Sequence, residues 1–183
     1  MIVNGMGKDD RYILCKDNAC LFLIALGCVW ATAAIVGETK YHFISILILL
    51  SGITLFKPIF QLIQRGFSLV SLSPDDPLKM LNKLLSIGIP IGLIVGFFPF
   101  KENINVFFPT FSILFGIIFG IIAYIYQIRL LGLTGILLIL SGFYYGLVQT
   151  DHFSTAGFTT ALLLAGSGIM VRFTKNKPSP KRI

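Results

Sequence analysis

The feature that most constrains this chain is a series of long apolar segments separated by short polar breaks. A transmembrane helix needs about 20 mostly apolar residues, because each residue adds only about 1.5 Å along the helix axis. We expect six such segments to cross a membrane: residues 19–36, 43–63, 84–100, 106–126, 130–148 and 153–171. The predicted fold class is therefore all-α, a polytopic transmembrane bundle of about six spans.

Composition supports this prediction. The chain of 183 residues has 55% hydrophobic and only 13% charged residues, whereas a soluble domain usually carries roughly 25% charged residues. This balance excludes an ordinary soluble enzyme, a disordered tail, a disulfide scaffold and a nucleic-acid-binding domain. The apolar segments are continuous rather than alternating, so helices are favoured over the strands of a closed barrel.

Two connections have their own local signals. Only residues 127–129 separate the fourth and fifth segments, which predicts a tight antiparallel hairpin, with one very long helix as the competing interpretation. In the longest connection, residues 64–83, the run Ser73-Pro74-Asp75-Asp76 is typical of a helix start, with Ser as N-cap and carboxylates in the first turn. We interpret it as a surface cap of the third span, the alternative being a loop that docks a partner.

The distribution of positive charge predicts the orientation. Thirteen of the 15 Lys and Arg residues fall on the side that holds both termini, and only Lys40 and Lys101 fall on the other. Because Lys and Arg near span ends stay in the cytoplasm, we expect both termini there. The expected organisation is a cytoplasmic segment 1–18, a six-span domain 19–171 and a basic, disordered cytoplasmic tail 172–183. The expected partners are the lipid bilayer and its anionic headgroups, with no nucleic acid.

The start of the chain leaves one alternative open. A signal peptide would also show basic residues before an apolar run, and Ala31-Thr32-Ala33 resembles a cleavage site. The leading segment is long and contains three aspartates, however, which favours an uncleaved first span. The cysteines Cys15, Cys20 and Cys28 have no spacing typical of a zinc site or a disulfide framework, so we expect them to pack as small apolar residues.

Glycines recur at intervals of four residues in three of the segments. Small residues at this spacing let helix backbones approach closely in lipid. We expect these glycines to form helix-packing faces within the chain, with a homodimer face or a backbone-lined substrate path as alternatives. They are Gly88, Gly92 and Gly96 in the third segment, Gly116 and Gly120 in the fourth, and Gly142 and Gly146 in the fifth.

Two groups of polar residues are candidate sites. Lys57 is the one charged residue inside a span, and Gln61 and Gln64 follow it one and two turns later. Its side chain either extends to the headgroups or forms part of a polar substrate site. The second group, Glu38, His42, Asp151 and His152, falls on the outer side. It would form a protonatable or metal-binding cluster if the first and fifth loops were neighbours, whereas the plain alternative is two ordinary polar loops.

Motifs of known enzyme classes are absent from the sequence, and neither paired carboxylates nor a histidine occur deep within a span. We therefore name no catalytic residue and expect no cofactor, and whether a metal binds is open. An enzyme is the least favoured functional class.

Several short motifs resemble a family of small six-span bacterial integral membrane proteins of unknown function. They are Trp30 in the first segment, Asp76-Pro77-Leu78 before the third, and Phe115-Gly116 with Tyr124 and Tyr126 in the fourth. Ile117 and Ile118 stand where that family has a His. The resemblance implies six helices and no particular activity. The layout also resembles the vitamin-binding subunits of energy-coupling transporters, although those usually carry a longer outer loop.

Two functions follow as hypotheses for a bacterial cytoplasmic membrane protein. The first is small-solute transport, or substrate binding as a membrane subunit. The second is an accessory or assembly protein that acts through helix packing, as a homo-oligomer or within a larger membrane complex. A polar site among the helices would favour the first, and a sealed apolar interior would favour the second.

Overall fold

The computed structural model describes residues 8–39, 41–66, 83–84, 86–88, 90–94, 100, 103–126, 129–148 and 153–173. Side chains are described in the same ranges except at residues 8–19, 56–66 and 126. Every regular element among these residues is helical, which confirms the all-α prediction. The elements are α1 (Lys8–Glu38), α2 (His42–Gly66), the 3₁₀ turn η2 (Ile104–Val106), α4 (Phe107–Tyr126), α5 (Arg129–Leu147) and α6 (Thr155–Phe173).

Four helices in the described part of the chain are long and apolar enough to cross a membrane: Cys20–Glu38, Ile104–Ile125, Arg129–Leu147 and Thr155–Phe173. The apolar part of α2 with described side chains, His42–Leu55, is shorter. Of the predicted third span, 84–100, only separate pieces are described, and residues 83–84, 86–88 and 90–94 are helical. The predicted helix start at Ser73–Asp76 lies outside the described residues.

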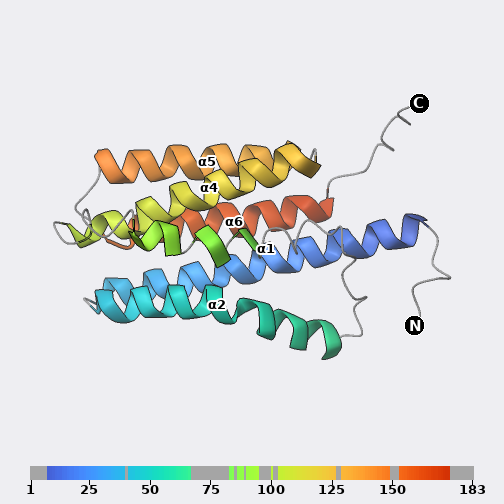
Figure 1. The fold of residues 1–183 in the computed structure, drawn as a ribbon, viewed down its shortest axis with the longest axis horizontal. Helices are drawn as coiled ribbons and strands as arrows, with labels where there is room; N and C mark the ends of the chain where they lie inside the picture. The colour runs from blue at the N-terminus through green and yellow to red at the C-terminus, as the bar shows by residue number, and fades with distance from the viewer. Residues whose placement is uncertain are drawn as a thin grey trace.

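The helix boundaries decide how α4 and α5 are connected, and they place the start of the first helix earlier than predicted. Since α4 ends at Tyr126 and α5 begins at Arg129, with the two helices packed side by side, the chain forms the predicted hairpin and not one long helix. The first helix begins at Lys8, well inside the segment 1–18, and its start extends past the ends of α4, α5 and α6 (Figure 1).

The helices alternate in direction along the bundle. In Figure 1, α1 ends and α2, α4 and α6 begin at one end, which we call the His42 end; α2, α4 and α6 finish and α5 begins at the other, the Arg129 end. The most extensive contacts join α4 to α5 and α1 to α6. In addition, α2 packs on α1, and α6 touches both α4 and α5.

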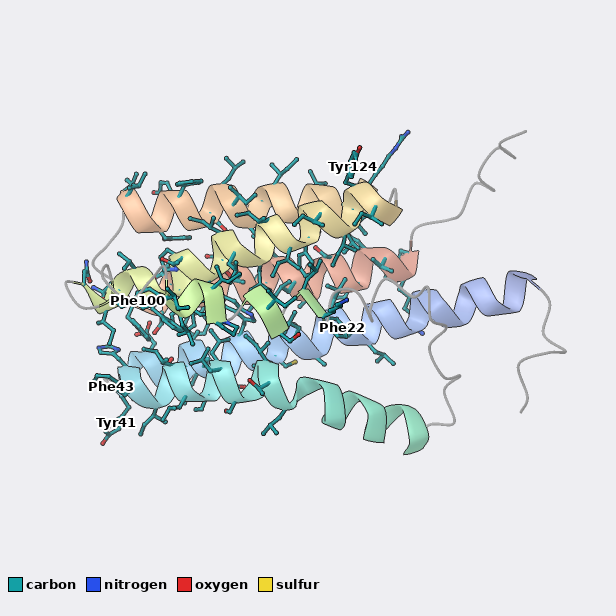
Figure 2. The ribbon with its side chains drawn as sticks, viewed as in Figure 1. Phe22, Tyr41, Phe43, Phe100 and Tyr124 are labelled. Carbon is teal, nitrogen blue, oxygen red and sulfur yellow. The ribbon has the colours of Figure 1, made fainter. Side chains whose placement is uncertain are left out.

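The surface of the bundle is apolar, as expected of a protein in lipid. The charged side chains that the structure describes, Glu38, Lys83, Arg129 and Arg172, are all exposed. Figure 2 shows Tyr41 and Phe43 at one end and Tyr124 at the other, the positions where aromatic residues meet the membrane–water interface. Between them, large apolar side chains are at least 60% exposed, among them Leu47, Ile94, Leu140, Leu147 and Leu162.

Aromatic side chains fill the interior. Trp30 of α1 is fully buried and packs against two rings of α4, with ring centroids 5.7 Å from Phe108 and 5.4 Å from Phe115. The buried face of α4 continues through Phe111 and Phe119. These residues recur every three or four positions and therefore lie on one side of α4, and this side faces the core.

Glycines bring the backbones of α4 and α5 into contact. A Cβ added to Gly116 would lie 2.6 Å from the carbonyl oxygen of Gly135, and one added to Gly142 would lie 2.7 Å from that of Pro109. Gly146 is less close, with Pro109 Cβ at 3.4 Å, and Gly120 has no atom within 4 Å of an added Cβ. Of the predicted packing glycines, Gly116 and Gly142 therefore have the tightest backbone contacts.

The glycines of the third segment pack differently. Added Cβ atoms would lie 2.9 Å from Ile118 Cδ1 at Gly88 and 2.7 Å from Leu114 Cδ2 at Gly92. Both neighbours are side chains of α4, so this segment lies against side chains and not against backbone. Gly96 lies outside the described residues.

Small residues also join α1 to α6, which sequence analysis missed. A Cβ on Gly27 would lie 3.0 Å from the carbonyl oxygen of Ala161, and one on Gly168 would lie 3.0 Å from that of Cys20. The glycines of α6 are not spaced four apart. Alanines complete the small-residue face, so a search restricted to glycine does not find it.

Candidate functional site

The first predicted polar group lies in the second half of α2. Lys57, Gln61 and Gln64 belong to that helix, so their spacing places them on successive turns of one face. Their side chains are not described, and the structure therefore gives no contact for them.

The second predicted group lies at the His42 end. Glu38 is the last residue of α1 and is exposed, and His42 is the first residue of α2. The ring centroids of His42 and Phe153 are 4.4 Å apart, so the start of α2 and the chain just before α6 are neighbours. Asp151 and His152 lie outside the described residues. No set of three or more metal-ligating side chains occurs among the residues that are described.

Three buried polar atoms have no hydrogen-bond partner in the described part of the chain: Trp30 Nε1, His42 Nδ1 and Ser154 Oγ. Leaving a buried polar group unpaired costs about 1–3 kcal/mol, so each such atom calls for an explanation. The other buried hydroxyls in the described part of the chain are all paired. Ser45 donates to the Ala33 carbonyl oxygen at 2.6 Å, and Thr160 donates to Ser112, which in turn donates to the Leu138 carbonyl oxygen.

Ser154 departs from its expected role as an N-cap. Its carbonyl oxygen accepts a hydrogen bond from the Phe158 N–H, as at the start of a helix, but its side-chain oxygen pairs with none of the described groups. That oxygen instead lies against α1, because a Cβ added to Gly37 would be 2.7 Å from it. An N-cap serine normally bonds to the first amides of its helix, and the Ser154 side chain does not.

The two helix ends at Ser154 have opposite polarity. Gly37 is in the last turn of α1, where the Val36 carbonyl oxygen accepts hydrogen bonds from the Thr39 N–H and hydroxyl, and Ser154 directly precedes α6. The partial negative charge at the end of α1 and the partial positive charge at the start of α6 offset each other. The two helix dipoles therefore add little net charge beside Ser154.

A series of contacts between aromatic rings leads from the neighbourhood of Ser154 into the core. The ring of Phe153 lies between His42, 4.4 Å away, and Phe108, 4.9 Å away, measured between centroids. Phe108 in turn contacts Trp30. All three unpartnered polar atoms thus belong to, or adjoin, one aromatic cluster at the His42 end. We call Gly37, His42, Phe108, Phe153 and Ser154 the His42-end site.

Sequence analysis singled out His42 but not Gly37, Phe153 or Ser154. Ser154 before an apolar run is a readable N-cap signal, but that signal predicts a paired hydroxyl. Only the packing of Gly37 on Ser154 shows that the hydroxyl is turned away from its own helix.

Comparisons with models of protein families, with curated proteins and with solved structures find no match to this chain.

Proposed function

We propose that this chain is a six-span protein of a bacterial cytoplasmic membrane, with both termini in the cytoplasm, that binds a small solute for transport, either alone or as the substrate-binding subunit of a transporter. One observation carries the proposal: buried polar atoms without partners, Ser154 Oγ and His42 Nδ1, lie beside the same aromatic ring at one end of a bundle whose deeper hydroxyls are paired.

A bound solute accounts for the unpaired atoms. A ligand that supplies hydrogen-bond partners recovers the cost of burying these atoms. In transporters, the ends of broken helices near the bilayer midplane face the polar groups of the substrate; here the ends of α1 and α6 meet at the His42 end of the bundle. The charge bias of the sequence predicts that the His42 end faces the outer side of the membrane, from which a solute would be captured.

The experiment is extraction of bound solutes from the protein purified in mild detergent, with identification by mass spectrometry. We compare the natural chain with Ser154→Ala and with Ser51→Ala, a matched control whose exposed hydroxyl bonds only to the Ile48 carbonyl oxygen in its own helix. A solute retained by the natural chain and the control but lost from Ser154→Ala supports the proposal. Extracts holding only lipid and detergent from all three proteins would contradict it.

A second candidate, an accessory protein that acts through helix packing, is favoured by a different observation. Gly120 and Gly166 are exposed on the surface of the bundle, and no described atom lies within 4 Å of a Cβ added to either. Exposed small residues let a helix of another protein, or of a second copy, approach closely in lipid. Affinity purification of the tagged chain tests this candidate: a stoichiometric ATPase or membrane subunit supports it, and recovery of the chain as a monomer opposes it.

A further inference from the structure

We propose that the bundle moves as two rigid bodies. The hairpin, which is α4 with α5, shifts against the three-helix group, which is α1 with α2 and α6, along an interface of hydroxyl and aromatic side chains. This inference concerns how the fold moves and goes beyond the proposed function, which names what the fold binds. Figure 1 shows the hairpin along one side of the bundle, α1 and α2 along the other, and α6 between them.

Within the hairpin, the two helices are in backbone contact. A Cβ added to Gly116 would lie 2.6 Å from the carbonyl oxygen of Gly135, and one added to Gly135 would lie 2.7 Å from that of Gly116. Backbone atoms cannot rotate away as a side chain can, and closely packed groups transmit displacement to one another. We therefore expect α4 and α5 to move together.

The three-helix group is held in the same way. A Cβ added to Gly27 on α1 or to Gly168 on α6 would lie 3.0 Å from a carbonyl oxygen of the facing helix. Helix α2 is joined to α1 by the buried hydroxyl of Ser45, which donates to the Ala33 carbonyl oxygen at 2.6 Å. Each contact uses a backbone atom, so these three helices also move as one body.

Between the two bodies, hydroxyl side chains face one another. Three residues of α6 each pair with a hydroxyl of the hairpin: the oxygens are 3.0 Å apart for Thr159 and Tyr145, 3.0 Å for Thr160 and Ser112, and 2.7 Å for Ser167 and Thr134. Side chains rotate as helices slide past one another, and small sliding of packed helices is a common form of conformational change. The interface is therefore the place where the bundle can shift.

Hydroxyls at this interface keep a partner when the bodies shift. Ser167 lies 2.6 Å from the Leu163 carbonyl oxygen of its own helix, and Thr159 lies 3.1 Å from that of Thr155. Ser112 donates to a carbonyl oxygen of α5, which belongs to the same body. The shift thus exchanges one partner for another and avoids the cost of leaving a buried hydroxyl unpaired.

The aromatic contacts between the bodies are also made by side chains alone. Trp30 of α1 meets Phe108 and Phe115 of α4, and Phe108 meets the ring of Phe153 before α6. Aromatic pairs attract one another over centroid distances of about 4.5–7 Å, so these contacts tolerate a shift. Because Phe108 belongs to the hairpin and His42 and Phe153 do not, the shift would widen the His42-end site; this consequence alone rests on the proposed function.

The experiment measures distances between two spin labels by double electron–electron resonance, on the full-length chain in lipid nanodiscs with its natural cysteines replaced by alanine. A rigid body that rocks moves most at its outer surface, so the labels go on the exposed residues Leu47, Leu140 and Leu162. The interface pair is Leu47→Cys on α2 with Leu140→Cys on α5. The control pair is Leu47→Cys with Leu162→Cys on α6, within one body. We expect the distance distribution of the interface pair to be about twice as wide as that of the control pair.

Removal of hydroxyls from the interface should free the hairpin further. Thr134→Val combined with Thr160→Val removes two of the three hydroxyl pairs. It should broaden the distribution of the interface pair and leave that of the control pair unchanged. Thr32→Val, at an exposed hydroxyl that bonds within its own helix, is the matched control and should change neither. Size-exclusion profiles and melting temperatures show whether each variant is folded.

The outcomes also separate this proposal from the proposed function. Equal widths of the two pairs in the chain with its natural hydroxyls overturn the motion, and so does equal broadening of both pairs in the double variant. An interface pair that the double variant leaves unchanged overturns the role of the hydroxyls. If widths are equal while solute retention depends on Ser154, the proposed function stands without the motion. A broad interface pair in a protein that retains no solute leaves the motion standing alone.

Discussion

The hydroxyl oxygens of Thr134 on α5 and Ser167 on α6 lie 2.7 Å apart, and both residues are buried. Each hydroxyl also lies within hydrogen-bonding distance of a carbonyl oxygen of its own helix, Thr134 that of Leu130 and Ser167 that of Leu163. Only one of the two hydroxyls can donate across the interface at a time, so the other is free to donate to its own helix. The pair therefore joins α5 to α6 and leaves neither hydroxyl unpaired.

We expect Thr134→Val to destabilise the bundle by about 1 kcal/mol, because hydrogen bonds between membrane helices average about 0.6 kcal/mol and reach about 1.7 kcal/mol. The measurement is reversible unfolding in mixed detergent micelles. Thr32→Val is the matched control, since its exposed hydroxyl bonds only to the Cys28 carbonyl oxygen in its own helix. Combination of Thr134→Val with Ser167→Ala should cost less than the sum of the two single changes; strict additivity would argue against a bond between them.

Gly135→Ala should separate α4 from α5. The added Cβ would lie 2.7 Å from the carbonyl oxygen of Gly116 and 3.1 Å from the backbone nitrogen of Gly120, and backbone atoms cannot rotate away as a side chain can. Overpacking of this kind typically costs about 1–3 kcal/mol, to be measured as a fall in unfolding free energy.

Gly166→Ala is the control for that prediction. No described atom lies within 4 Å of its added Cβ, and alanine favours a helix over glycine by about 1 kcal/mol. The control should therefore be neutral or stabilising. Equal destabilisation by Gly135→Ala and Gly166→Ala would show that helix propensity, and not the α4–α5 contact, sets the cost.

The sequence was sufficient to predict the four long apolar helices, because apolar length depends on local composition. Gly116 and Gly142 fit the expected four-residue spacing, and the structure places both against backbone. Gly120 fits the same spacing but has open space around it. Spacing fixes which glycines share a face of a helix, whereas which part of that face meets a neighbour depends on the crossing of the two helices. That crossing is not encoded in either segment alone.

The candidate site was harder to predict for a related reason. His42 and Ser154 are far apart in the chain, and each alone is an ordinary residue at the start of a helix. What sets them apart is the absence of described partners for their buried atoms, together with the ring of Phe153 between their helices. Neither property exists before α1, α2 and α6 are packed together.

The orientation of the bundle can be tested with single cysteines in a chain whose three natural cysteines are replaced by alanine. Thr39→Cys, at the His42 end, should react with an impermeant maleimide added to intact cells. Arg129→Cys should react only after the membrane is opened, because the charge bias predicts that this end lies in the cytoplasm. Both residues are exposed in the bundle, so access through the membrane and not burial decides the result. The opposite pattern would invert the topology.

Trp30 should be closed to water in the unliganded protein. It is fully buried, and its indole ring meets Phe108 and, edge to face, Phe115. Its Nε1 has no partner among the described residues, so we expect blue-shifted emission typical of an indole that bonds to no water. Iodide in the aqueous phase should quench it at least tenfold less than free tryptophan.

Phe108→Ala removes the ring that links Trp30 to Phe153, so water should reach the indole and shift its emission to longer wavelength. Phe143→Ala, at a ring that is 51% exposed on α5, is the control and should not shift the emission. Strong iodide quenching of the natural chain would show that the His42 end is open to water and that the unpaired atoms are hydrated.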